Sequence, residues 1–250
     1  VEAVGAGVAG VAPGDDVYGL LTGGGFGEYV SVPADLLAPK PANLSYEQAA
    51  AVPMAGITAL VALRDSGRLE PGQRVLVNGA SGGVGTFTVQ LAKALGATVT
   101  GVCGPHNVEL VRSLGADEVV DYRATDFTRT GRRYDLLVDN AGGRTAFACR
   151  RVLDRRGRMV VVGGPAGRWL QPAAHVFGAV LAGPLVSRRV LVADAVGCED
   201  KRQALATLTE FIEAGRVTPV VHRSFPFAEL PAAVSYQEQG HASGKVVVTR

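Results

Sequence analysis

The architecture is set by the stretch Arg74-Val75-Leu76-Val77-Asn78-Gly79-Ala80-Ser81-Gly82-Gly83-Val84-Gly85. Its apolar start predicts a buried strand, and the helical pattern of Val84–Leu95 follows the turn. Gly79, Gly82 and Gly85 lie three residues apart. That spacing lets the backbone turn tightly, approach a pyrophosphate and pack the helix close to the strand. Because a helix N-terminus offers N–H groups to phosphates, the stretch predicts a dinucleotide-binding turn.

Strand and helix patterns alternate after this stretch. A second strand is expected over Ala97–Cys103, and further strands over Glu118–Asp121, Leu136–Asp139, Met159–Val162 and Val190–Val192. These runs are rich in valine and leucine with little polar alternation, which is typical of strands covered on both faces. We therefore expect an α/β fold with a doubly wound parallel sheet of six strands.

The two ends of the chain have a different pattern. Ser45 and Gln48 form a capping box for a helix through Ala51, and an apolar helix is expected over Gly56–Leu63. Short β patches lie at Asp16–Tyr18, Glu28–Val32, Val217–Val221 and Lys245–Thr249, and a helix is expected over Asp200–Ala214. The patches predict a smaller β-rich unit beside the parallel sheet.

Composition excludes several classes of protein. Hydrophobic residues make up 47% of the 250 residues and charged residues 19%, with 33 glycines, which fits a globular α/β protein and not disorder, coiled coil or collagen. Lys and Arg number 25 against 23 Asp and Glu, a net charge of +2. The densest basic group, residues 150–158, is interrupted by Asp154 and apolar residues. Without a basic stripe, no nucleic-acid partner is expected.

Cysteine usage and hydropathy bear on the compartment. Cys103, Cys149 and Cys198 are odd in number and far apart, which excludes a disulfide framework and paired-cysteine zinc motifs. We therefore expect a reducing, cytoplasmic location. The uncharged segment Trp169–Ser187 contains prolines and turn-forming residues, so we expect a buried helix with loop ends there and no membrane partner.

The glycine-rich turn also fits a second motif. Residues 79–83 match G-x-S-x-G, the nucleophile elbow of α/β-hydrolases, with Ser81 as nucleophile and Asp139 or Asp154 followed by His222 in the required order. The elbow strand, however, normally follows several earlier strands of the sheet, and Gly85 suits helix packing better than an oxyanion hole. Asn140-Ala141-Gly142 is found in short-chain dehydrogenases, but no tyrosine has Lys four positions later. Dinucleotide binding is the better interpretation.

Four stretches together resemble a known family. Gly72–Gly85, Gln90–Ala97, Leu114–Asp117 and the closing Gly244–Val248 are similar to the zinc-independent quinone oxidoreductases, the zeta-crystallin-like branch of the medium-chain dehydrogenase/reductase superfamily. The resemblance extends over essentially the whole chain. It implies a GroES-like catalytic domain made of residues 1–57 and 216–250, and an NAD(P)-binding Rossmann domain over residues 58–215.

Members of that family carry a further stretch before the position of Val1, and this stretch ordinarily contributes residues to the substrate site. We therefore expect that the N-terminal part of the GroES-like domain is missing from this sequence, and we assign no catalytic residue. Two hypotheses follow: a reductase, or a cofactor-binding module without turnover.

Zinc is not expected. Zinc alcohol dehydrogenases place a four-cysteine lobe between the equivalents of Tyr18 and Phe26, because structural zinc needs a closed thiolate shell. Only Leu20–Gly25 lies there, and neither Cys103 nor Cys149 falls where the resemblance would put a catalytic ligand. Without a Lewis acid, the natural reaction is hydride addition to a quinone, enone or similar conjugated carbonyl, polarised by hydrogen bonds.

The end of the second strand bears on cofactor choice. An acid there would bind the ribose 2′-hydroxyl of NADH and repel a 2′-phosphate, but Val102-Cys103-Gly104-Pro105-His106-Asn107 has none. His106, Asn107 and the later Tyr122-Arg123 could surround a phosphate. We therefore expect NADPH.

The predicted cofactor site draws on several parts of the chain. The turn contributes Gly79, Ser81, Gly82, Gly83, Val84 and Gly85, and the next strand end contributes Gly104, His106, Asn107 and Tyr122. The resemblance implies Thr58 beside the nicotinamide and Gly244 and Lys245 near the adenosine phosphates. It also implies backbone at Asn140–Gly142 and Val162–Gly164 along the carboxamide and ribose, with Asn140, Gly163 and Gly164 as the named residues.

The last strand of the sheet predicts an assembly. Arg189–Ala193 is rich in valine and leucine, and an exposed apolar edge strand is usually covered. The resemblance implies that the same strand of a second copy covers it, which makes a homodimer.

Overall fold

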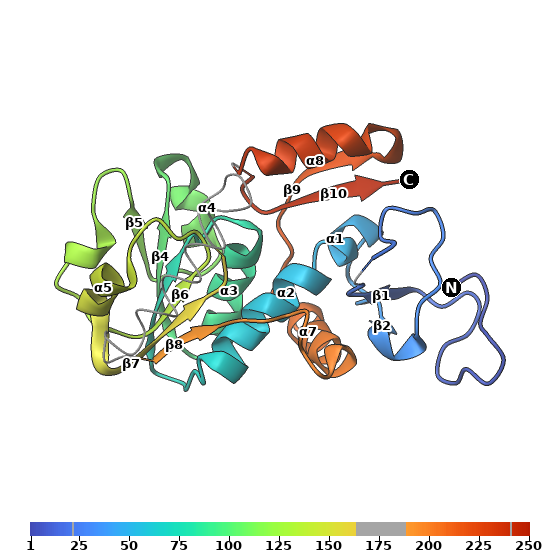
Figure 1. Cartoon of the computed structure of the whole chain (residues 1–250), viewed down its shortest axis with the longest axis horizontal. Coiled ribbons are helices and arrows are strands. Elements are labelled where there is room, and N and C mark those ends of the chain that lie inside the picture. Colours follow the sequence, from blue (N-terminus) through green and yellow to red (C-terminus); the bar gives the residue numbers. More distant parts are fainter. Residues whose placement is uncertain (22, 164–188, 241) are drawn as a thin grey trace.

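The computed structural model describes residues 1–21, 23–163, 189–240 and 242–250. Its centre is a six-stranded sheet with strand order β5-β4-β3-β6-β7-β8, in which every neighbouring pair is parallel (Figure 1). The strands are β3 Arg74–Asn78, β4 Thr98–Cys103, β5 Glu118–Asp121, β6 Tyr134–Asp139, β7 Leu153–Val161 and β8 Arg189–Val192. The predicted doubly wound α/β fold is confirmed, and the order of strands along the chain reverses between β3 and β6.

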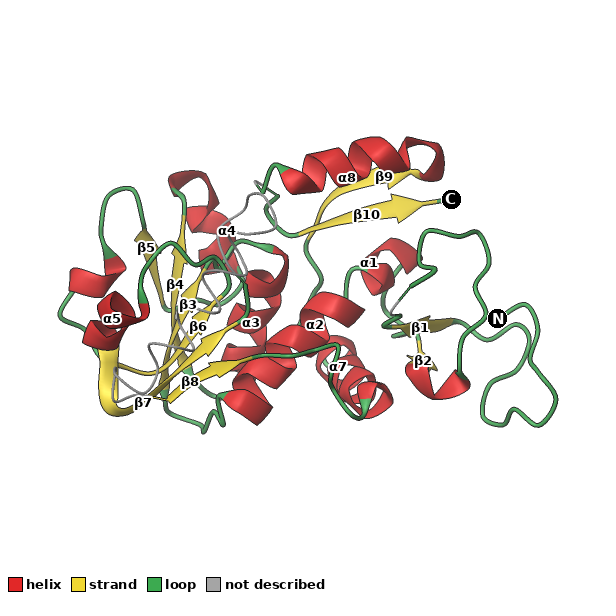
Figure 2. Ribbon diagram, viewed as in Figure 1, coloured by secondary structure: helices red, strands yellow, loops and turns green. Residues whose placement is uncertain are grey.

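Helices lie on both sides of this sheet (Figure 2). The α-helices are α1 Tyr46–Ala50, α2 Pro53–Leu60, α3 Gly83–Ala94, α4 Val108–Ser113, α5 Ala146–Cys149, α7 Lys201–Glu213 and α8 Leu230–Glu238. A π-helical segment, η2 Val61–Ser66, extends α2, and short 3-10 turns lie at η1 Ala34–Leu36, η3 Pro105–Asn107, η4 Phe127–Arg129, η5 Arg150–Val152 and η6 Phe227–Glu229. The Asp200 carboxylate caps α7 by accepting the Gln203 N–H at 2.8 Å.

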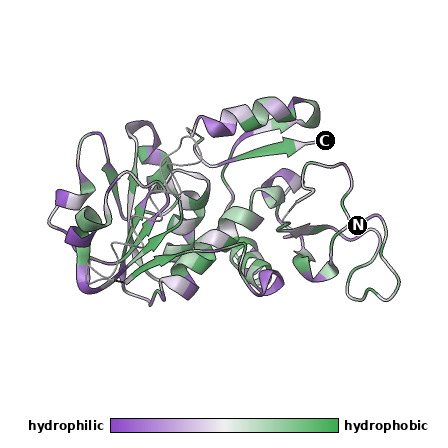
Figure 3. Ribbon diagram, in the orientation of Figure 1, coloured by the Kyte–Doolittle hydropathy of each residue, from purple (hydrophilic) through white to green (hydrophobic). Residues whose placement is uncertain are grey.

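Alternation along the strands separates two cores. Val75 and Val77 of β3 belong to a core shared with α2, α3 and α7, whereas Leu76 belongs to a second core with Phe127 and Cys149. Successive side chains of a strand point to opposite faces, so each core covers one face of the sheet. The apolar colouring of the central strands in Figure 3 agrees with this burial.

Two small sheets lie outside the large one. β1 Val17–Gly19 pairs antiparallel with β2 Leu37–Pro39, and β9 Val221–Pro226 pairs parallel with β10 Lys245–Thr249. The capping box is confirmed: the Ser45 hydroxyl accepts the Gln48 N–H at 3.2 Å, and Gln48 Oε1 accepts the Ser45 N–H at 3.0 Å. These sheets form the part of the molecule next to both termini (Figure 1).

Two predicted β patches are wrong. Glu28–Val32 forms no strand: Tyr29 and Val30 are 70% and 48% exposed, and in the described part of the chain residues 28–32 belong to no strand pair. Val217–Val221 is also not a strand, because β9 begins only at Val221. The preceding residues bond elsewhere: Val217 N–H reaches the Phe211 carbonyl at 3.3 Å, and Thr218 bonds to the Gln90 side chain.

Several boundaries shift. The helix predicted from Gly56 begins at Pro53, and the strand predicted from Met159 begins at Leu153. The predicted domain boundary between residues 57 and 58 falls inside α2, and the boundary at 215 follows α7. The helix predicted within Trp169–Ser187 lies outside the described residues. Within the described ranges, no helix has the length and apolar character that crossing a bilayer requires.

Candidate functional site

The strand order reverses between β3 and β6, and the carboxyl ends of these two strands lie side by side at that point. The chain leaves β3 into residues 79–82 and leaves β6 into residues 140–145. In open α/β sheets, ligands bind at this point. The ends of β4 and β7 lie beside it in the sheet.

The glycine-rich turn has the shape that close approach requires. Gly79 has a left-handed φ of +74°, and a Cβ added there would lie 2.9 Å from the Ala141 Cβ. A Cβ on Gly85 would collide with the Gly79 carbonyl oxygen, so only glycine lets α3 pack this closely. Gly82 is the N-cap of α3 and has no side chain to bond the first turn. Ser81 and Val84 are half-buried. The predicted strand, turn and helix are confirmed.

Lys245 lies over the first turn of α3. A Cβ added to Gly83 would be 2.8 Å from Lys245 Cδ and 3.6 Å from its Nζ. Gly244 forms a parallel β-bridge with Gly82, which holds this approach. Among the described residues the ammonium has no hydrogen bond or carboxylate partner, and burial lowers the pKa of Lys245. An unpaired, partly buried cation at a helix N-terminus suits a phosphate.

The loop after β6 leaves one acceptor without a partner. Asn140 N and Nδ2 both donate to the Asn78 carbonyl at 3.1 Å. Its Oδ1 is buried and has no hydrogen-bond partner within the described ranges. Gly163 packs on the same residue, since an added Cβ would lie 2.9 Å from the Asn140 carbonyl oxygen. Gly164 lies outside the described residues.

The end of β4 brings several predicted residues together. A Cβ on Gly104 would lie 3.4 Å from Tyr122 Oη, and Tyr122 N–H donates to the Cys103 carbonyl at 3.1 Å. His106 is exposed, whereas Asn107 Oδ1 accepts a 2.7 Å bond from Ser243 Oγ. The C-terminal segment thus contacts both the turn after β3 and the loop after β4.

The structure adds one carboxylate that the sequence argument did not consider. Asp121 of β5 pairs in register with Cys103, and its Oδ1 accepts the Arg123 N–H at 2.9 Å. The sequence analysis considered only the end of β4. Asp121 was missed because it reaches this place through the pairing of β5 with β4.

Thr58 uses its hydroxyl within its own helix. Its Oγ1 donates to the Met54 carbonyl at 2.5 Å, and the side chain is buried. Only the acceptor capacity of this oxygen is left for a ligand.

The nucleophile-elbow alternative has no assembled triad. His222 bonds to Tyr236 Oη at 2.6 Å, and Asp154 bonds to Arg74 at 2.6 Å. Asp139 accepts from Asn78 at 2.7 Å. In the described part of the chain, neither His222 nor Asp154 bonds to Ser81.

No cluster of three or more His, Cys, Asp or Glu side chains that could hold a metal occurs among the described residues. Burial raises the pKa of the Cys103 thiol to about 11 and that of the Cys149 thiol to about 12. Both thiols therefore stay protonated at neutral pH.

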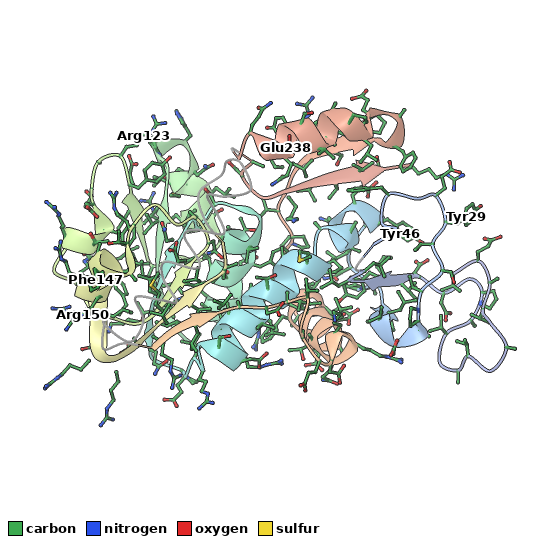
Figure 4. All side chains as sticks on the ribbon, viewed as in Figure 1. Tyr29, Tyr46, Arg123, Phe147, Arg150 and Glu238 are labelled. Carbon is green, nitrogen blue, oxygen red and sulfur yellow. The ribbon has the colours of Figure 1, made fainter. Side chains whose placement is uncertain are left out.

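A cavity of about 870 Å³ lies between β1, residues 23–30, α1 and the end of β10. Phe26 and Tyr46 line it and are 64% and 63% exposed. Figure 4 shows Tyr29 and Tyr46 at this end of the molecule, beyond the six-stranded sheet. None of the predicted cofactor residues that the structure describes lines the cavity.

Three known proteins that this chain resembles are oxidoreductases by name. Residues 114–248 match the family described as zinc-binding dehydrogenase. The mitochondrial NAD(P)H oxidoreductase RTN4IP1 of Bos taurus is 33% identical, over 94% of this chain and 64% of the relative. A chloroplast envelope quinone oxidoreductase homolog of Arabidopsis thaliana is 33% identical, over 99% of this chain and 76% of the relative. The solved quinone oxidoreductase of Coxiella burnetii superposes with a TM-score of 0.85 at 28% identity, over 99% of this chain and 76% of that one. This chain thus spans less than two thirds of RTN4IP1.

Proposed function

The chain belongs to the zinc-binding dehydrogenase family of medium-chain dehydrogenases/reductases, and we propose that it transfers hydride from NADPH to a quinone, enone or similar conjugated carbonyl without zinc. The observation that carries the proposal is the placement of Lys245 over the first turn of α3, beside the N-cap Gly82. A cation without a carboxylate partner and a helix N-terminus together form a site for a pyrophosphate.

The fit of the cofactor rests on three features of this chain. The N–H groups of Gly83 and Val84 have no side-chain cap, so they and Lys245 would hold the pyrophosphate. Asn140 Oδ1 is a buried acceptor that a carboxamide or ribose donor would satisfy. Gly163 and Thr58 are assigned to the same half of the cofactor. When bound, the nicotinamide supplies the hydride.

The preference for NADPH is supported by the end of β4. Gly104 is not an acid, and Tyr122 lies beside it. His106 is exposed and free to bond a phosphate, while Asn107 is already bonded to Ser243. We assign the 2′-phosphate to Gly104, His106, Asn107 and Tyr122, although Asp121 lies on the neighbouring strand.

The acceptor is assigned from chemistry and relatives. The names of two relatives specify a quinone oxidoreductase, and a quinone can be polarised by hydrogen bonds alone. We further propose two domains, with boundaries after residues 57 and 215, and a homodimer. The widely spaced cysteines favour a reducing cytoplasm, whereas the names of two relatives place those proteins in mitochondria and the chloroplast envelope.

One experiment tests the proposal. NADPH binding is followed by nicotinamide fluorescence, and NADPH oxidation is measured in parallel with a simple quinone. We expect both, with activity that survives chelators and no stoichiometric zinc on elemental analysis. Binding without oxidation would favour a cofactor-binding module. Absence of binding would remove both functions, and zinc at one per chain would overturn the metal-free mechanism.

A further inference from the structure

Two buried polar side chains lie at the carboxyl ends of the two central strands. Asn78 is the last residue of β3, Asp139 is the last residue of β6, and the two are partners in register. Asn78 is 6% exposed and Asp139 is 0% exposed. A buried amide and a buried carboxylate are unfavourable unless hydrogen bonds satisfy them. We therefore asked which groups satisfy these two side chains at the ends of two apolar strands.

The contacts of this pair converge on one glycine. Asn78 Nδ2 donates to Asp139 Oδ1 at 2.7 Å and to the Gly142 carbonyl at 2.9 Å. Gly142 N–H donates to Asp139 Oδ1 at 2.8 Å. Two side chains thus satisfy both backbone groups of Gly142 and tie the loop to the two central strands.

The tied segment, residues 140–143, lies beside the glycine-rich turn. Gly142 and Gly143 both have left-handed φ values, +68° and +82°, which turn the chain back sharply. Ala141 contacts Gly79 of the glycine-rich turn, and Asn140 presents its unpartnered Oδ1. The Asn78 and Asp139 side chains therefore fix the position of residues 140–143 relative to the glycine-rich turn.

We propose that Asn78 and Asp139 are positioning residues that hold residues 140–143 in the place that binding of the nicotinamide half of the dinucleotide requires. The inference rests on the proposed function, because it needs a dinucleotide bound at the carboxyl ends of β3 and β6. We expect Asn78 and Asp139 to affect binding of the nicotinamide half alone. The adenosine half is assigned to the first turn of α3, Lys245 and the loop after β4, whereas the hydrogen bonds of the Asn78 side chain go to Asp139 and Gly142.

The test compares two ligands. NADPH carries both halves, whereas 2′,5′-ADP carries only the adenosine half. In Asn78→Leu both amide donors are lost, and we expect the dissociation constant of NADPH to rise about tenfold while that of 2′,5′-ADP changes by less than about twofold. Asp139→Asn keeps an acceptor for Gly142 N–H, so we expect it to retain most of the NADPH affinity. Both constants come from calorimetry and need no turnover.

A matched control separates positioning from general loss of stability. Gln90→Leu also removes a buried amide with its hydrogen bonds, but on α3, facing Thr218. We expect it to lower the melting temperature and leave the ratio of the two dissociation constants unchanged. If Asn78→Leu does not fold, Asn78→Thr keeps one donor and tests the same ratio.

The outcomes are distinct. If the wild type binds neither ligand, the proposed function fails. If the wild type binds both, the inference is overturned when the Asn78 variants weaken both ligands equally or weaken neither. A rise confined to NADPH supports it.

Discussion

The side-chain amide of Gln90 makes two hydrogen bonds with the backbone of Thr218: Nε2 donates to the carbonyl at 3.0 Å, and Oε1 accepts the N–H at 2.8 Å. Gln90 lies on α3 of the large sheet unit, and Thr218 lies in the segment that leads to β9. The same Nε2 also donates to the Thr86 carbonyl at 2.9 Å. The Gln90 side chain therefore satisfies the backbone of Thr218 as a neighbouring strand would. It joins α3 to the segment that leads to β9.

Replacing this amide tests its contribution to stability. In Gln90→Leu the N–H and carbonyl of Thr218 lose their partners, so we expect the free energy of unfolding to fall by about 1 to 3 kcal/mol, measured by urea denaturation. Gln203→Leu, at an exposed glutamine on α7, is the control and should change stability by less than about 0.5 kcal/mol. Equal effects would contradict a special role for Gln90.

Gly82→Val tests the pyrophosphate site in a protein that should still fold. Gly82 has an ordinary φ of −77°, and the nearest atom to an added Cβ is the Gly79 carbonyl oxygen at 3.5 Å. The valine side chain would cover the N–H groups of α3, so we expect NADPH affinity to fall by at least about tenfold in a fluorescence titration. Gly5→Val, also unobstructed, is the control. Unchanged affinity in Gly82→Val would refute the site.

Lys245 predicts a pH dependence of cofactor binding. Burial lowers the pKa of its ammonium below the ordinary 10.5. A bound phosphate favours the charged form and raises that pKa again, so binding takes up protons and affinity falls as the pH rises through the lowered pKa. Calorimetry at increasing pH measures this. Lys245→Met should remove the dependence in this window and weaken NADPH about ten- to a hundredfold at pH 7.

The same shift has a defined sign for stability. In the ligand-free protein the unfolded state binds more protons between the lowered pKa and the ordinary one, so the free energy of unfolding rises with pH over that window. Lys245→Met should flatten this rise, because the variant lacks the ammonium whose pKa burial lowers. A Lys245→Met protein with the wild-type pH profile would contradict the assignment.

Gly104→Asp tests cofactor choice. A Cβ there makes an ordinary 3.4 Å contact with Tyr122 Oη, so the side chain fits. A carboxylate should repel the 2′-phosphate by about 1 to 3 kcal/mol, roughly ten- to a hundredfold in NADPH affinity, and offer the ribose of NADH a partner. Gly104→Asn has the same size without the charge. His106→Ala and Tyr122→Phe should weaken NADPH only. A wild type that prefers NADH would overturn the whole assignment.

The edge strand predicts the oligomeric state. β8 pairs with β7 along one edge, and no described strand pairs with its other edge, where Val192 is 41% exposed. We expect light scattering at micromolar concentration to give twice the chain mass of 25.8 kDa. Val192→Lys should raise the dimer dissociation constant by at least about tenfold, because an edge charge opposes strand pairing. Val8→Lys, 40% exposed and far along the chain, is the control. A monomeric wild type would refute the dimer.

Much of the fold was predictable because its signals are local. Each of the strands β3 to β8 contains a short apolar run, and the capping box at Ser45 and Gln48 spans only three positions. The spacing of Gly79, Gly82 and Gly85 likewise specifies a turn whose glycines all contact one another or the next loop. The errors have the same origin. Residues 28–32 and 217–221 have β-like composition, but a strand needs a partner, and composition does not supply one.

The candidate site divides in the same way. Its glycine-rich turn follows from neighbouring residues, since φ, ψ and side-chain volume are properties of short stretches. Asn78 and Asp139 are 61 positions apart, and Asn107 and Ser243 are 136 positions apart. Those pairs exist because β6 inserts beside β3 and because the C-terminal strand returns to α3. The amino-acid pattern predicts where the strands are. The order in which they pair is decided by packing of the whole chain, and only that order brings these polar atoms within hydrogen-bond distance.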